Sequence, residues 1–376
     1  MHLFLMWVLY FKMSRYSPLH MSEFDKYIVQ GEPDKKAKAN AWQTAIGLQD
    51  VDGLKPSEYL IKTAVQHIEG DITIDQVKDM LDTYYETKDV REHLDDERTE
   101  EADKVSARIT EILSEQSFSF TPDYLLRTHR RLFEGIYKHA GQLRDVNITK
   151  KEWVLNGDTV RYSNYDMLRE TLEYDFGQEK KTDYSVLNAD MAVKQICKFV
   201  SGIWQIHPFR EGNTRTTAVF TMKWLQTFGF SVDNDVFKDN SWYFRNALVR
   251  ANYNNIPKRI FATSEYLELF FRNLLFGEQN KLSNRTMLAG GPQSATQEIS
   301  KSQNGTLDGT LNCNLDELAL LRYVKEYPDA TQIEIAKHIG KSERTVKRMT
   351  PALIERGLLE RENGKRNGKW VVKCEI

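Results

Sequence analysis

Residues 207–217 read His-Pro-Phe-Arg-Glu-Gly-Asn-Thr-Arg-Thr-Thr, and they separate two helical patterns. Apolar residues recur at helical spacing over 193–204 and again over 219–225. We therefore expect one helix to end near His207 and a second helix to hold Gly212–Arg215 in its first turn. The first N–H groups of a helix have no partner within the helix and carry the positive end of its dipole, so this turn predicts an anion site.

The residue types in this stretch suit a nucleoside triphosphate. His207 can accept a proton at neutral pH, and Glu211 can hold Mg²⁺ beside phosphate oxygens. Gly212 permits close backbone approach, while Asn213 and Arg215 can donate to charge that develops on phosphate. The alternative is a buried histidine at a helix end and a surface Glu–Arg ion pair. The complete set at this spacing favours the functional interpretation.

The stretch resembles the signature of the Fic family, HxFx[D/E]GNGRxxR, and the resemblance extends from Thr121 through His129 and Arg144 to about Phe276. Most members of that family transfer AMP from ATP to protein hydroxyls. The resemblance implies a mainly α fold, a helical bundle with a β-hairpin flap at residues 96–278. It also implies a protein adenylyltransferase with ATP as substrate, Mg²⁺ at Glu211, His207 as general base, and a Tyr, Ser or Thr of a target protein, or of the chain itself, as acceptor.

Two positions depart from the signature. Thr214 replaces the second glycine and adds a β-branched side chain that could donate a hydroxyl or crowd the phosphates. Ala218 replaces the second arginine, which in the family contacts the γ-phosphate and pairs with an inhibitory glutamate.

The N-terminal region, residues 31–95, resembles a fused form of the VbhA-type antitoxins that silence Fic toxins. Their motif [S/T]xxxE[G/N], followed by L-x-P-S, aligns with Leu48, Asp52 and Gly53 and with the following Leu-Lys-Pro-Ser. The inhibitory carboxylate is thus one methylene shorter, and its arginine partner is missing. We expect a helix that covers the site but restrains γ-phosphate binding weakly. The alternative is a helical packing domain with a turn at Asp52-Gly53.

A flap is predicted between Arg144 and Tyr165, with two strand-like arms around Asn156-Gly157, a pair that supplies the positive φ angles of a hairpin turn. The family resemblance implies that this hairpin holds the target by strand addition. Lys150 and Lys151 are predicted to meet nucleotide phosphate or target acid, or else to form a solvated charge pair.

The family's adenine pocket corresponds to Tyr243, Phe244 and Asn252, where an aromatic face would stack on the base and an amide would read its edge. Aromatic residues at helical spacing are also typical of a core, and both interpretations stay open.

Residues 279–312 are rich in Gly, Ser, Thr, Asn and Gln and predict a flexible linker. Residues 313–376 read as a winged helix-turn-helix with an excess of basic residues after Lys341, which predicts DNA binding or, alternatively, protein contacts. Pro351 predicts a kink or a new start in the third helix. The residues expected at DNA are Arg344, Lys347, Arg348, Arg361, Lys365 and Arg366.

Composition limits the remaining possibilities. The 376 residues are 40% hydrophobic with a formal net charge of -2, so bulk charge does not favour nucleic acid. Three cysteines without a C-x-x-C spacing fit a reducing cytoplasm without zinc. Residues 1–30 contain a nine-residue apolar run that is too short to span a bilayer, and we expect a disordered or mis-started extension and no membrane partner.

Three functions therefore compete. The first is the adenylyltransferase. The second is a DNA-binding regulator or toxin–antitoxin-like switch whose changed Thr214 and Ala218 leave a weakly active nucleotide-binding core. The third is removal of AMP by the same site. Retention of His207, Glu211 and Arg215 favours the transferase.

Overall fold

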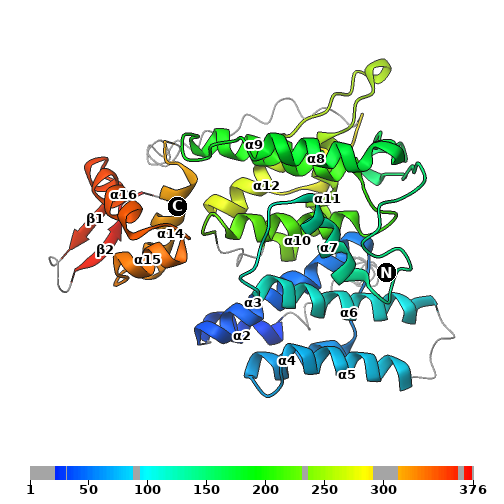
Figure 1. The fold of residues 1–376 in the computed structure, drawn as a ribbon, viewed down its shortest axis with the longest axis horizontal. Helices are drawn as coiled ribbons and strands as arrows, with labels where there is room; N and C mark the ends of the chain where they lie inside the picture. The colour runs from blue at the N-terminus through cyan, green and yellow to red at the C-terminus, as the bar shows by residue number, and fades with distance from the viewer. Residues whose placement is uncertain are drawn as a thin grey trace, which may run out of the picture. The chain divides into compact units, whose positions relative to one another are not determined.

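A computed structural model describes residues 22–30, 32–87, 94–230, 236–290, 312–362 and 368–374. These residues are mostly helical, which confirms the predicted mainly α class (Figure 1). Contacts divide the chain into two compact units, Met1–Glu115 and Gln116–Ile376.

The N-terminal unit is a set of helices around one apolar core. Its elements are α2 (Ser22–Gln30), α3 (Pro33–Gly47), the 3₁₀ helix η1 (Leu48–Asp52), α4 (Glu58–Glu69), α5 (Ile74–Thr87) and α6 (Leu94–Ser114). Buried Trp42 donates its indole N–H to Nδ1 of His67 at 3.0 Å. The sequence predicted that the Fic-like bundle begins at residue 96. The contacts instead group α6 with the N-terminal unit.

Helix α2 corrects part of the prediction for the extension. Phe24 and Tyr27 are three residues apart, lie on one helix face and are buried in the core of the N-terminal unit. Burial of two aromatic rings stabilises the helix, so residues 22–30 are ordered. The rest of the predicted extension, residues 1–21, lies outside the described residues.

The second unit contains the bundle that carries the signature stretch. Its helices are α7 (Pro122–Phe133), α8 (Leu168–Glu179), α9 (Ala189–Ile206), α10 (Asn213–Gln226), α11 (Val236–Ala251) and α12 (Glu265–Phe276). Helices α8 and α9 lie side by side, and α10 packs on α7 and α9 (Figure 1). Helix α9 ends and α10 begins where the sequence predicted, which leaves residues 207–212 as the loop between them.

The start of the predicted linker is packed rather than flexible. Residues Asn284–Met287 form a 3₁₀ helix, η5, and Met287 is fully buried. Ala289 donates its N–H to Val154 O at 2.8 Å and accepts from the Asn156 amide at 2.7 Å. The polar composition concealed these few anchoring contacts. Residues 291–311 lie outside the described residues.

The C-terminal residues form the predicted helix-turn-helix and wing strands. The elements are α14 (Leu315–Glu326), α15 (Gln332–His338), α16 (Glu343–Glu355), β1 (Leu359–Glu362) and β2 (Lys369–Val372). The strands are antiparallel with Leu359 opposite Val372. Helix α16 continues through Pro351, so the predicted new start is absent there. None of the described helices is long and apolar enough to cross a membrane.

Candidate active site

His207 ends α9 in a left-handed conformation, with φ 51° and ψ 59°. The residue is only 3% exposed, and Nδ1 lies 3.3 Å from Trp204 O. A hydrogen on Nδ1 would make this bond and leave the lone pair on Nε2. Nε2 has no hydrogen-bond partner among the described residues. Burial, then the charges of Lys150, Arg245 and Arg144, lower the pKa of His207, so the ring is neutral and keeps its lone pair on Nε2.

Two buried side chains brace the loop that follows His207. Arg144 donates Nε to His207 O at 2.8 Å and Nη1 to Val146 O at 2.7 Å, and it also contacts Ser163 O. His129 accepts from Gly141 N–H at 2.8 Å, so its other nitrogen donates to Glu211 O at 3.1 Å. Burial lowers the pKa of His129 to about 3, which keeps this bridge neutral.

Asn213 also braces this loop. Its side-chain oxygen accepts from Phe209 N–H at 2.9 Å, and its amide donates to Phe209 O at 2.8 Å. The sequence predicted that this amide donates to nucleotide. In the structure the side-chain oxygen and one amide hydrogen bond within the loop, so Asn213 braces the start of α10, and its contact with nucleotide stays a prediction.

The opening of α10 has no side-chain cap on its first N–H groups. Gly212 caps the helix with φ 70° and offers no side chain that could accept from the first N–H groups. A Cβ at Gly212 would lie 2.4 Å from the ring of Phe133. Only glycine therefore fits there, and residue 212 has no side chain that competes with phosphate oxygens for the first N–H groups of α10.

Arg215 and Thr214 lie in the first turn and are both buried. Arg215 donates Nη2 to the Tyr137 hydroxyl at 3.2 Å, and its guanidinium lies 4.8 Å from the centroid of the Phe133 ring. Thr214 accepts from the Trp204 indole N–H at 3.0 Å. The added hydroxyl is thus bonded to α9.

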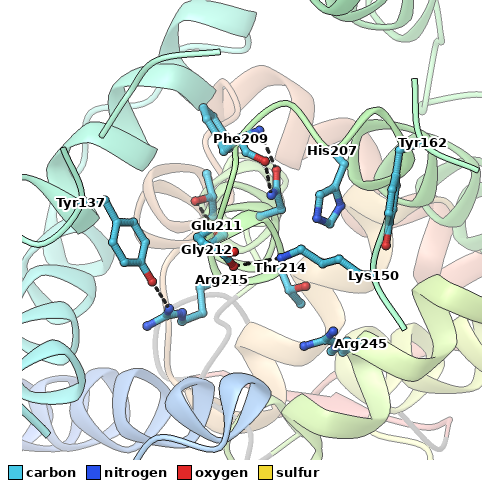
Figure 2. A network of polar contacts seen from close by, with 12 residues as sticks. Tyr137, Lys150, Tyr162, His207, Phe209, Glu211, Gly212, Thr214, Arg215 and Arg245 are labelled. Atoms are coloured by element: carbon cyan, nitrogen blue, oxygen red, sulfur yellow. Dashed lines mark hydrogen bonds and ion pairs between the residues drawn. The ribbon is translucent and has the colours of Figure 1, made fainter. Parts of the chain in front are cut away.

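Glu211 lies beside the opening of α10 and pairs with Lys150, whose Nζ is 2.9 Å from Oε2 (Figure 2). The Glu211 side chain is 57% exposed. Mg²⁺ typically binds one or two carboxylates and completes its shell with water and substrate phosphates. Among the described residues, no three or more acidic, His or Cys side chains are grouped so that they could hold a metal ion by themselves. One accessible carboxylate beside a phosphate site fits Mg²⁺ held jointly with nucleotide.

The predicted flap has the expected turn but not the expected strands. Asn156 and Gly157 have φ 56° and 86°, and Asp158 N–H donates to Leu155 O at 3.2 Å, as in a type I′ turn. The first arm, however, is a 3₁₀ helix, Trp153–Leu155, since buried Val154 and Leu155 pack into the bundle. Residues 144–165, all of which the structure describes, contain no β-strand.

The flap contributes to a buried ion pair near His207. Glu152 is 2% exposed and accepts from Arg245 Nη2 at 3.1 and 3.2 Å, and the Tyr162 hydroxyl lies 3.4 Å from it. Tyr162 in turn covers the His207 ring. Figure 2 shows Lys150, Tyr162 and Arg245 on the same side of the α10 opening as His207. Lys151, the other lysine predicted here, is exposed.

The predicted base pocket is part of the core. Phe244 is fully buried among Phe237, Phe270 and Phe271, and the Tyr243 hydroxyl donates to Tyr266 O at 3.1 Å. The Asn252 amide donates to Ser201 O and Leu248 O, both at 3.0 Å. The structure therefore does not bring these rings to the site; the helical spacing of aromatic residues reflected packing.

The other predicted residues lie as follows. In the N-terminal unit, Leu48 is buried, Asp52 ends η1, and Gly53 caps it with φ 67°, while Arg98 donates to Asp52 O at 2.7 Å. On α16, three cations are exposed: Arg344, Lys347 and Arg348. Arg361 instead lies 4.3 Å from the centroid of the Trp370 ring. Lys365 and Arg366 lie outside the described residues.

Sequence reasoning missed Tyr137, Glu152 and Arg245. Arg245 and Glu152 are 93 residues apart, and neither belongs to the signature. A signal for Arg245 was its place directly after the aromatic run 242–244, where a charge interrupts the apolar pattern.

Comparison with known proteins agrees with this geometry. Residues 119–225 match the model of the Fic/DOC family, and residues 313–371 match the model of the MarR family. The chain is 27% identical over 121 residues to protein adenylyltransferase VbhT of Bartonella schoenbuchensis. The aligned region covers 32% of this chain and 24% of that protein. It is also 27% identical over 124 residues to the probable protein adenylyltransferase y4lH of Sinorhizobium fredii. That aligned region covers 33% of this chain and 60% of that protein.

The match thus spans about a quarter of the first relative and three fifths of the second. The family matches coincide with the bundle around His207 and with the helix-turn-helix and wing. This chain therefore joins a Fic domain to a C-terminal winged helix domain of the MarR type.

Proposed function

We propose that the chain transfers AMP from ATP to a Tyr, Ser or Thr hydroxyl of a target protein, and also to itself. The observation that carries this proposal is the buried Nε2 of His207, which has no partner among the described residues and belongs to the loop that leads into the uncapped first turn of α10. A neutral imidazole next to backbone donors can take a proton while the donors stabilise a phosphoryl group.

In this reaction the acceptor hydroxyl gives its proton to His207 Nε2. The hydroxyl oxygen forms a bond to the α-phosphorus, the bond from that phosphorus to the bridging oxygen breaks, and pyrophosphate leaves. The first-turn N–H groups and Arg215 stabilise the negative charge. Bound Mg²⁺, held by Glu211, would neutralise phosphate charge.

The test uses ATP labelled on the α-phosphate, with purified protein and a cell extract as the source of targets. Label should enter protein with the wild type and fail to enter with His207→Asn, a residue that tolerates the left-handed backbone at this position. ATP labelled on the γ-phosphate should give no labelled protein. Transfer of the γ-label, or equal α-labelling by His207→Asn, would overturn the proposal. Loss of AMP from a premodified target in the absence of ATP would instead support the reverse activity.

We further propose that the winged helix binds duplex DNA, which the MarR match and the exposed cations of α16 support. Each phosphate contact contributes about -0.9 to the slope of log affinity against log salt. Replacement of Arg344, Lys347 and Arg348 by Ala should therefore make the slope shallower by roughly 2 to 3. Lys337→Ala on α15 is the matched control and should leave it unchanged. Binding that is insensitive to salt would favour a protein-contact role.

For the N-terminal unit we propose weak inhibition. Support comes from Asp52, whose side chain is one methylene shorter than the glutamate of the antitoxin motif, and from Ala218, which stands where the family signature has its second arginine.

A further inference from the structure

The ion pair between Lys150 and Glu211 joins the flap to the proposed metal ligand. Lys150 Nζ lies 2.9 Å from Glu211 Oε2, and the Lys150 side chain is 26% exposed. The backbone of Lys150 is fixed as well, because its N–H donates to Thr159 Oγ1 at 3.2 Å on the other arm of the flap. The ammonium group is therefore held at the carboxylate by a structured segment.

The charge of Glu211 is unfavourable for an incoming nucleotide. A carboxylate beside the opening of α10 repels a triphosphate unless a cation neutralises it. Nearby cations have other partners: Arg245 pairs with Glu152, Arg210 with Asp145, and Arg215 bonds to Tyr137. Lys150 is the cation that the structure places on Glu211.

We propose that Lys150 is the resident counter-ion of Glu211, neutralising this carboxylate while no divalent cation is bound so that a metal-free nucleoside triphosphate can enter the site. This inference rests on the proposed nucleotide site at α10. It makes Lys150 a positioning residue that acts through Glu211. The Lys150 ammonium and a divalent cation then serve the same carboxylate in turn, because both at once would repel each other.

The exposure of Glu211 supports this exchange. With 57% of its side chain accessible, the carboxylate can be reached by hydrated cations without opening the core. Lys150 also lowers the pKa of His207, so its ammonium acts electrostatically on the base from the same position. Displacement of Lys150 from Glu211 therefore changes the electrostatic potential at His207 as well as at Glu211.

Calorimetric titration of the full chain with the α,β-methylene analogue of ATP, which cannot release pyrophosphate, tests the inference. Affinity is measured with excess EDTA and with excess Mg²⁺ for the wild type, Lys150→Met and Lys151→Met. In EDTA, Lys150→Met should bind about tenfold more weakly than the wild type, since the charge of Glu211 is then uncompensated. In Mg²⁺ the two should agree within roughly twofold. Lys151→Met, which removes the exposed neighbouring charge, should match the wild type in both.

A second background separates action through Glu211 from direct contact with phosphate. In Glu211→Gln, which keeps the shape and removes the charge, Lys150→Met should have almost no effect in EDTA. A loss that persists in this background, or an equal loss in EDTA and Mg²⁺, would overturn the inference. If the wild type does not bind the analogue even with Mg²⁺, the proposed nucleotide site itself fails.

Discussion

The ring of Tyr162 lies over the imidazole of His207, with the two centroids 4.2 Å apart and the planes inclined by 33°. Trp204 meets the same imidazole edge-on at 5.4 Å. The base is thus held between an aromatic face from the flap and an aromatic edge from α9. Its orientation depends on residues outside the signature.

Tyr162→Ala should lower the rate of AMP transfer by about tenfold or more, because the imidazole loses one wall and Nε2 is no longer held in one direction. Tyr162→Phe keeps the ring and removes only the 3.4 Å contact to Glu152, so its rate should stay within roughly threefold of the wild type. Rates are compared at saturating ATP. Equal effects of Ala and Phe would show that the hydroxyl, rather than the ring, matters.

The value of kcat/KM for AMP transfer should stay constant as the pH falls through the range in which an ordinary histidine titrates. Burial, Lys150, Arg245 and Arg144 all lower the pKa of His207, so protonation of the free enzyme requires more acid. The acid limb of kcat/KM reports this group and should lie below pH ~6.5. Removal of one positive charge in Lys150→Met should raise the pKa and move the limb towards neutral pH. A limb that does not move in this variant contradicts the assignment.

His129 should make the fold sensitive to acid. Its pKa falls from the ordinary 6.5 to about 3 on burial, so the unfolded chain binds this proton more readily. The contribution to stability is complete above pH ~6.5 and is lost as the pH falls towards 3. His129→Gln should be less stable at pH 7, and the deficit should shrink by up to about 2 kcal/mol at pH ~5. Urea unfolding at both pH values measures it, and a constant deficit would contradict it.

Gly212→Ala should abolish most activity and destabilise the chain. The new methyl group would lie 2.4 Å from Phe133, at a backbone φ of 70°. Backbone strain alone costs about 1–3 kcal/mol. Gly70→Ala is the control, because it has φ 90° with nothing within 4 Å of the added Cβ. Thermal unfolding should show a smaller loss of stability for Gly70→Ala than for Gly212→Ala, and Gly70→Ala should keep its activity. Equal losses of stability would argue against the steric role of Phe133.

If the N-terminal unit inhibits weakly, as proposed, Asp52→Ala should change the rate of AMP transfer by less than about threefold, because this carboxylate is one methylene shorter than the glutamate of the antitoxin motif. The backbone bond from Arg98 to Asp52 O is retained in this variant. Activation by roughly tenfold or more would show that Asp52 is a strong inhibitor.

The sequence predicted those parts of the site that depend on local rules. The end of α9, the glycine at the start of α10 and the Asn156-Gly157 turn follow from helical spacing and from backbone conformation. For Tyr243 and Phe244 the sequence left both a core and an adenine pocket open, because one aromatic pattern serves both, and the structure buries the two rings among other aromatic residues. Arg245 was overlooked because its pairing with Glu152 arises from tertiary folding. Residues 279–290 were expected to be flexible because composition does not reveal the contacts of Met287 and Ala289.

The hydrogen bond from the Trp204 indole to Thr214 changes how the departure from the family signature is understood. Because the Thr214 hydroxyl is bonded to α9, it is directed away from the volume that the proposed triphosphate would occupy. The position of the Thr214 hydroxyl then depends on Trp204, ten residues earlier. Searches that insist on glycine would discard such chains, whereas searches that accept threonine together with an upstream tryptophan would recover them.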